Sequence, residues 1–409
     1  MIGGRSTHFI SPPQIIMSAP VKDSEGRSTD ETAEQLLKRH FSTISAASTS
    51  SLASLLSRST DRPSSPAQSE HLRVIGLGSC GTVFELSGTE LVFKKGTKRQ
   101  SIWQDFSLTN HAHYAAQDVQ GTLQNAFPSA VIPQIPFCHR FHEASDESFW
   151  TEDRLRQFPC RHQSRQPLLL ETQILPLPKS VREALIELYF DDDTTVQQQA
   201  KDNQENQDCL VRVYLGEREN PEQQAEGYTS LRNFEMRLNM MEDLELDISA
   251  IATEMAIGLA MLHWEAKIDA MDTEFVLGRS ATWNTGAVQP EEDALPKAEK
   301  SVNFRRRDIH LWMLDYDKAT AIELTEEDVI QKLVPGFMGN DPYFPMPNVD
   351  EELWGVFSAA YLKASATMLR ARKASKMVKR LPKKFLEGVV EQVKKNEDWD
   401  AGDNVVFGD

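Results

Sequence analysis

The stretch RVIGLGSCGTVFELSGTELVFKKGTK, residues 73–98, contains three glycines in the spacing G-x-G-x-x-G. They are Gly76, Gly78 and Gly81. Two unrelated folds use this spacing to hold phosphate groups, and they differ in the element that comes after the last glycine. In one fold the chain enters a helix, and in the other it continues as a strand. The residues after Gly81 therefore decide the fold class.

The residues after Gly81 predict a strand. The segment TVFEL alternates and is rich in β-branched and aromatic side chains, and Ser87-Gly88 marks a turn before the next such run, TELVFKK. A dinucleotide-binding unit would instead place a helix here, with its N-terminus facing the pyrophosphate. We therefore expect the glycines to lie in a β-hairpin, as in the protein-kinase loop G-x-G-x-x-G-x-V, in which Val83 takes the last position.

The strand after the hairpin supplies a lysine for the phosphates. Strand alternation in LVFKK places Val92 and Lys94 on one face, so we expect Val92 to contact the adenine and Lys94 the α- and β-phosphates. Lys95 points the other way. Glu171, in the later strand PLLLETQILPLP, is a further residue that we expect at the nucleotide. The alternative interpretation is a glycine-rich turn in an ordinary sheet.

Three acidic residues complete the predicted site. An apolar helix ending in LH is followed by KID and by the apolar run FVL. Aligned on FVL without a gap, Asp269 takes the place of the kinase catalytic base, and Glu274 that of a Mg²⁺ ligand. Asp315, after the run WML, would hold Mg²⁺ against the phosphates. A shift of the alignment by one residue would place Ala270 and Phe275 at the positions of the base and the Mg²⁺ ligand, and the loop would then be inactive.

Several positions depart from the kinase pattern. The helix expected after Lys94 has no Glu to pair with that lysine, and its only acidic residues are Asp105 and Asp118. Lys267-Ile268 replaces the His-Arg of the catalytic loop, and PYFPMP lacks the Glu of the A-P-E element. A non-catalytic, pseudokinase-like interaction or regulatory protein is therefore the alternative to a phosphotransferase.

The order of the expected elements predicts an α+β protein with a two-lobed, protein-kinase-like fold. Strands and one helix fill a small β-rich N-lobe over residues 71–178, and helices dominate a larger C-lobe over residues 179–400. An acidic, Gln-rich insert lies near residues 191–225. Residues 1–70 are rich in Ser, Thr, Ala and Pro and predict a disordered tail, in which ETAEQLLKRHFSTI can form a short amphipathic helix.

Three stretches carry a resemblance to a known family. LHWEAKIDAMDTEFVLG, FRRRDIHLWMLDYDKA and NDPYFPMPNVDEELWGVFSAAYL resemble an uncharacterised fungal family, a domain of unknown function whose members are often labelled zinc finger protein. This likeness covers roughly residues 134–362, and the chain resembles the protein-kinase-like superfold more distantly. The resemblance implies family membership but no activity, because none is established for that family.

The cysteines and histidines do not follow a zinc-finger pattern. CHRFH and CRH supply Cys138, His139, His142, Cys160 and His162, which lack the paired C-x₂₋₄-C and H-x₃₋₅-H spacing of structural zinc sites. We therefore do not expect zinc; the alternative is that Cys138 and His142 meet Cys160 and His162 in space and bind it. The kinase-like residues indicate ATP and Mg²⁺ as the cofactors.

Charge and composition limit the partners of the chain. Its 44 Lys and Arg against 61 Asp and Glu give a net charge of −17, which disfavours nucleic acid and anionic membranes. The sequence has no apolar run of membrane-spanning length and no secretory signal pattern, so we expect a cytoplasmic or nuclear protein. A protein partner is expected through the basic cluster of residues 370–384 or through the N-terminal tail. A solvated helix face is the other interpretation of that cluster.

Overall fold

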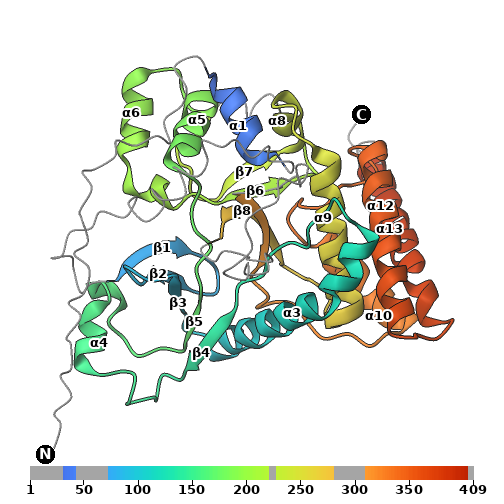
Figure 1. The fold of residues 1–409 in the computed structure, drawn as a ribbon, viewed down its shortest axis with the longest axis horizontal. Coiled ribbons are helices and arrows are strands. Elements are labelled where there is room, and N and C mark those ends of the chain that lie inside the picture. Colours follow the sequence, from blue (N-terminus) through green and yellow to red (C-terminus); the bar gives the residue numbers. More distant parts are fainter. Residues whose placement is uncertain (1–30, 43–71, 221–226, 281–308, 404–409) are drawn as a thin grey trace, which may run out of the picture.

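The computed structural model describes residues 31–42, 72–220, 227–280 and 309–403, which form two β-sheets and a set of helices (Figure 1). This confirms the predicted α+β class. The first sheet is antiparallel, in the order β1-β2-β3-β5-β4. Its strands are β1 (Arg73–Leu77), β2 (Thr82–Glu85), β3 (Leu91–Lys95), β4 (Cys138–His142) and β5 (Leu168–Thr172).

The glycine-rich stretch forms the predicted hairpin between β1 and β2. The Gly78 N–H donates to the Gly81 carbonyl at an N···O distance of 2.9 Å, which closes the turn. The chain then runs through β2 into β3, where Val83 lies directly opposite Lys94. The lysine strand is therefore the immediate neighbour of the hairpin.

A long helix, α3 (Arg99–Ala126), comes after β3 and packs on one face of the first sheet. Ile102 of this helix forms a buried cluster with Cys138 of β4 and Leu169 of β5. The sequence predicts this helix, and the structure extends it at both ends. The first turns of α3 therefore lie next to the strands that carry Lys94.

The opposite face of the first sheet packs against the segment that contains α4 (Glu152–Gln157). Phe93 points to this face, and its ring centroid lies 6.1 Å from that of Phe158. Because side chains alternate along a strand, Val92 and Lys94 point to the other face.

The second sheet has four strands in the order β7-β6-β8-β9. They are β6 (Val211–Tyr214), β7 (Phe234–Arg237), β8 (Glu274–Arg279) and β9 (Ile309–Leu314). β6 and β7 are parallel, and the other neighbours are antiparallel. The segment YTSLRNFEMRLNMMEDLEL has apolar residues at helical spacing, which predicts a helix. This prediction is wrong at β7, because Phe234 and Met236 are buried in a strand that pairs with β6. β6 itself comes from the segment predicted to be an acidic insert.

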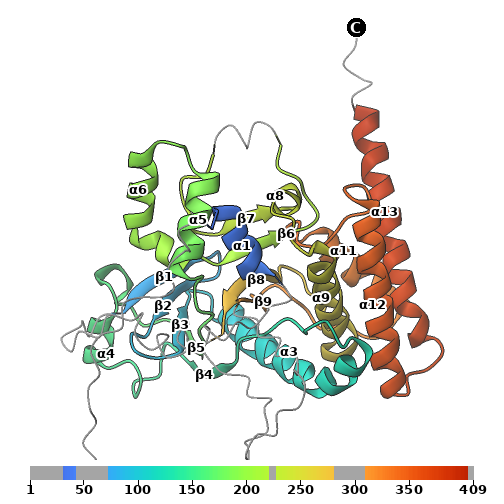
Figure 2. The same cartoon turned by 45° about the horizontal axis from the view of Figure 1, so that its top comes forward.

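Helices surround the second sheet. α9 (Ile248–Met261) is buried along most of its length and packs against α12 (Glu351–Ala371), which lies beside α13 (Leu381–Asp403) (Figures 1 and 2). The segment SVREALIELYF predicts a helix with Ser180 as its N-cap. α5 begins at Lys179 instead, so Ser180 lies inside the helix. Among the described residues, no helix combines the length and the apolar character needed to cross a membrane. The remaining helices are α5 (Lys179–Tyr189), α6 (Thr194–Asp202), α8 (Leu238–Asp243), α10 (Glu326–Asp328) and α11 (Val334–Met338).

One helix, α1 (Ala33–Phe41), corrects the prediction of a disordered tail over residues 1–70. Thr32 and Gln35 form a capping box at its start. Leu36 and Leu37 are buried in the main core, where the helix lies against α5 (Figure 1). The short amphipathic helix expected in this stretch is thus part of the folded protein. The rest of the predicted tail lies outside the described residues.

Candidate functional site

A cleft lies between the glycine-rich hairpin of the first sheet and strands β8 and β9 of the second sheet. Its apolar walls are Val83 and Val92 on one side and Leu210, Val276 and Leu314 on the other. Nine of the ten predicted site residues line this cleft. They are Gly76, Gly78, Gly81, Val83, Val92, Lys94, Glu171, Glu274 and Asp315.

Lys94 is the centre of the polar part of the cleft. Its Nζ lies 2.6 Å from Asp105 Oδ2 and 2.9 Å from Asp315 Oδ1. Burial opposes the charge of Lys94, but Asp105, Asp315 and Glu171 outweigh it and hold the pKa of the lysine well above its usual value. The ammonium group is therefore a permanent positive charge inside the cleft.

Asp105 of α3 is the acidic partner closest to Lys94. It is buried on α3, and its Oδ1 also accepts hydrogen bonds from Thr109 Oγ1 (3.2 Å) and from the backbone N–H of Tyr316 (3.1 Å). The sequence marks Asp105 as the acidic residue near the helix start but does not establish the pair. The signal is its position in the first turns after the lysine strand.

Asp315 follows directly after strand β9 and has an unusual backbone conformation. Its φ of 63° lies in the left-handed region, which few residues other than Gly adopt. Burial disfavours its charge, but the ion pair with Lys94 prevails and lowers the pKa of Asp315. The carboxylate of Asp315 is therefore ionised in the cleft, next to the end of β9. Strained backbone of this kind is concentrated at functional sites.

Glu171 lies beside Lys94 on the neighbouring strand and is opposite Val92. Burial, together with the carboxylate of Asp105, raises the pKa of Glu171 to about 8. Its carboxyl group is therefore largely protonated at neutral pH. A protonated carboxyl group can donate a hydrogen bond as well as accept one.

Glu274 forms an ion pair with Arg212 of β6. Burial raises the pKa of Glu274 to about 7, although Arg212 opposes this shift. Arg212 also reaches Asp341 Oδ2 at 3.3 Å. The sequence prediction misses Arg212, whose only signal is an arginine between the buried valines of VRVY.

Asp269 is the one predicted site residue outside the lining of the cleft. It is buried, and its Oδ1 accepts hydrogen bonds from the N–H groups of Thr320 (2.9 Å) and Met271 (3.1 Å). Its Oδ2 accepts from Thr320 Oγ1 at 2.5 Å. The structure thus joins Asp269 to the segment after Asp315 and does not bring it to Lys94. Its role as a base stays a prediction.

Cys80 connects the tip of the hairpin to the same segment. Its Sγ donates a hydrogen bond to Asp317 Oδ2. Burial, followed by Asp317, raises the pKa of the Cys80 thiol, so it stays protonated at neutral pH. This contact holds the hairpin down over the cleft, and the sequence gives no signal for it.

Comparison with known proteins supports one part of the sequence interpretation. Residues 311–373, which run from β9 through α12, match a family of unknown function described as zinc finger protein. No curated protein and no solved structure matches the chain. Within the described ranges, no group of three or more His, Cys, Asp or Glu side chains is arranged to hold a metal ion.

Proposed function

We propose that this cleft binds a nucleoside triphosphate together with Mg²⁺, in a protein-kinase-like arrangement of an N-lobe and a C-lobe. The observation that carries the proposal is the 2.9 Å contact of Lys94 Nζ with Asp315 Oδ1 beneath the glycine-rich hairpin. A lysine on the strand after such a hairpin and an aspartate at a strand end are the two groups that hold phosphates and their metal in kinases.

The rest of the lining has matching chemistry. Val83 and Val92 above and Val276 below offer apolar surfaces for a flat base. The backbone N–H groups of the hairpin and the ammonium of Lys94 supply positive charge for the phosphates. Asp315 and Glu274 would supply the carboxylate oxygens that Mg²⁺ prefers, and each would exchange its ion pair, with Lys94 or with Arg212, for the metal. Mg²⁺ keeps several ligands from water and phosphate, so two carboxylates are sufficient on the protein side.

Binding without phosphate transfer is the function that we infer from the loop before β8. Both carboxylate oxygens of Asp269 are already engaged by Thr320 and Met271. A general base needs a free oxygen within reach of the hydroxyl that it deprotonates. A pseudokinase-like nucleotide sensor accounts for these contacts better than a phosphotransferase does.

A thermal-shift assay tests the proposal. A ligand that binds only the native state at 100 times its Kd adds about 2.7 kcal/mol to the free energy of unfolding. We expect ATP with Mg²⁺ to raise the melting temperature of the wild type but not of Lys94→Met or Asp315→Asn. Lys98→Met, which changes an exposed lysine close by, should retain the shift.

Each variant is compared with and without nucleotide, because both cleft substitutions disturb buried charges and alter the starting melting temperature. A wild type that shows no shift at millimolar ATP would contradict nucleotide binding. Radiolabelled phosphate transfer to the chain or to a generic substrate would show that catalysis is retained, against the inference from Asp269.

A further inference from the structure

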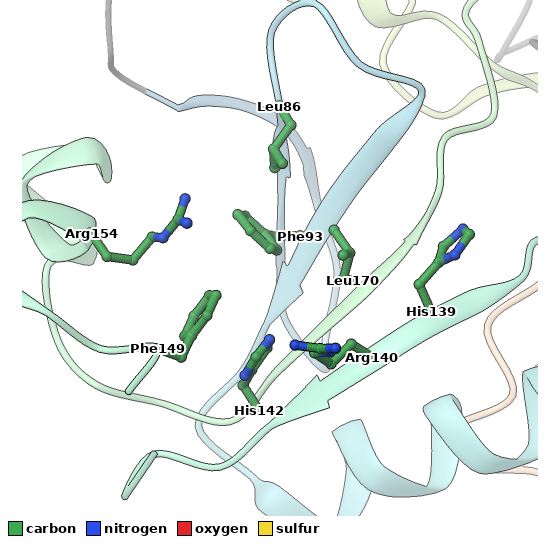
Figure 3. Close-up of a pocket in the computed structure, with 8 residues that line it drawn as sticks. All are labelled: Leu86, Phe93, His139, Arg140, His142, Phe149, Arg154 and Leu170. Atoms are coloured by element: carbon green, nitrogen blue, oxygen red, sulfur yellow. The ribbon is translucent and has the colours of Figure 1, made fainter. Parts of the chain in front are cut away.

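A second pocket, of about 410 Å³, lies on the face of the first sheet that is turned away from the cleft (Figure 3). Its volume is within the range of small-ligand sites, roughly 300–1,000 Å³. Figure 3 shows Arg140, His142, Phe149 and Arg154 arranged around Phe93. His139 lies farther along β4, the strand that carries Arg140 and His142. The pocket is lined by Leu86, Phe93, His139, Arg140, His142, Phe149, Arg154 and Leu170.

The charge of this pocket is opposite to that of the chain. The lining contains two arginines and no carboxylate, although the net charge of the protein is −17. Arg140 is exposed and forms no ion pair with any described residue. Arg154 donates to Gln157 Oε1 (2.8 Å), and its guanidinium lies 5.3 Å from the centre of the Phe149 ring. Both charges are thus available to an anion.

The carboxylates near the pocket are already engaged. Asp146 accepts a hydrogen bond from His142 Nδ1 at 2.8 Å, which fixes the ring in its stack on Phe149. Glu143 pairs with Arg99 at 2.6 Å. Neither residue lines the pocket or neutralises its arginines. An incoming ligand would therefore be the partner of these charges.

The pocket opens along the edge strand of the sheet. β4 ends the strand order in the described part of the chain, and a bulge between Cys138 and Arg140 makes His139 the extra residue. The bulge explains why two consecutive residues, His139 and Arg140, both line the pocket. At Cys138 the side chain of Asn110 bonds both backbone groups, at 2.9 Å each, and closes the edge there. Beyond this point no described strand pairs with the outer edge of β4, the edge turned away from β5.

We propose that this pocket and the β4 edge bind an extended acidic peptide of a partner protein. An aromatic side chain of the peptide reaches across β4 toward Leu170 of β5, while separate acidic side chains of the peptide bond Arg140 and Arg154. Bidentate pairs of arginine with carboxylate are strong and geometrically specific. Addition of a peptide to a sheet edge combines main-chain hydrogen bonds with side-chain pockets, and an edge strand beside a charged pocket offers both.

Fluorescence anisotropy of the full chain with labelled peptides tests this proposal. The probe is Glu-Glu-Phe-Glu-Glu, compared with Gln-Gln-Phe-Gln-Gln and Glu-Glu-Ala-Glu-Glu. We expect the probe to bind at least about tenfold more tightly than either control peptide, because it alone has both the anion and the apolar group. Raising the salt concentration should weaken its binding.

Variants locate the site. Arg140→Gln should weaken binding of the probe about tenfold, and Arg154→Gln should do the same. Arg156→Gln is the matched control, because Arg156 is on α4 as well but is exposed and pairs with Asp153 at 3.3 Å. It should change Kd less than about twofold. Arg140 is exposed, so its variant should keep the melting temperature of the wild type.

Three results would overturn the proposal. The first is equal binding of the glutamine peptide, and the second is unchanged affinity in both Arg140→Gln and Arg154→Gln. The third is displacement of the labelled probe by phenylacetate at the same concentration at which unlabelled peptide displaces it. That result would make the pocket a site for small aromatic acids. N-methylation of the peptide backbone should weaken binding, because it removes donors to the β4 edge.

Discussion

At the scale of single residues, the contacts of Lys94 predict that Asp105 stabilises the fold. Asp105→Ala removes one buried partner of the lysine and the acceptor for Tyr316 N–H. Loss of one member of a buried ion pair costs about 3–5 kcal/mol. Urea unfolding should show this decrease in the free energy of unfolding.

The control for this prediction is Asp118→Ala on the same helix. Asp118 is exposed, and its nearest cation is Arg372 at 3.6 Å. Its loss should change the free energy of unfolding by less than about 1 kcal/mol. Equal effects of the two substitutions would mean that the pair between Lys94 and Asp105 does not stabilise the fold.

Glu171 predicts a dependence of stability on pH. The folded state keeps the proton of Glu171 up to about pH 8, whereas the unfolded chain releases it near the ordinary value of 4.5. Between these pH values the folded state binds more protons than the unfolded chain. The contribution of Glu171 to stability therefore falls as the pH rises from about 4.5 to about 8. Glu171→Gln should make the decrease in stability between about pH 5 and pH 8 smaller.

Urea unfolding at several pH values measures this effect. The control is Glu90→Gln, which changes an exposed glutamate in the turn between β2 and β3. Parallel pH profiles for the wild type and Glu171→Gln would contradict a buried, protonated Glu171. A Gln keeps the shape of the side chain and lacks the titrating proton, so the comparison isolates that one group.

At the scale of elements, the glycine-rich hairpin depends on close packing at one glycine. A Cβ at Gly81 would lie 2.6 Å from the carbonyl oxygen of Lys95, whereas at Gly78 the nearest atom is 3.9 Å away. Gly81→Ala should therefore destabilise the protein by about 1–3 kcal/mol in urea unfolding. Gly78→Ala should stay within about 1 kcal/mol of the wild type. The same loss in both variants would show that the hairpin is not packed against β3 as described.

The elements also show how far local patterns determine the fold. Strand alternation predicted that Val92 and Lys94 share a face, and the hairpin, α3 and α9 agree with short-range periodicity. β7 could not be predicted in this way, because its pairing with β6 comes from a segment more than twenty residues earlier. The apolar spacing of FEMRLNMM suits a helix locally, and the pairing in the sheet decides the conformation.

At the scale of the whole molecule, the candidate site is assembled from distant parts of the chain. The hairpin, Glu171 and Asp315 come from three separate segments, and the order of elements predicted that they would meet in one cleft. The contacts of Asp269 with Thr320 and the docking of α1 on α5 depend on side-chain packing, which no local pattern encodes. The matched family, over residues 311–373, covers only part of this assembly.

Calorimetric titration of the full chain with ATP, with and without Mg²⁺, measures whether the cleft binds nucleotide. We expect one saturable site with a Kd below about 1 mM in the presence of Mg²⁺. Removal of Mg²⁺ should weaken binding to the wild type, and Asp315→Asn should lose this dependence on the metal. Absence of binding heat in the folded wild type at millimolar ATP with Mg²⁺ would show that the cleft does not bind nucleotide.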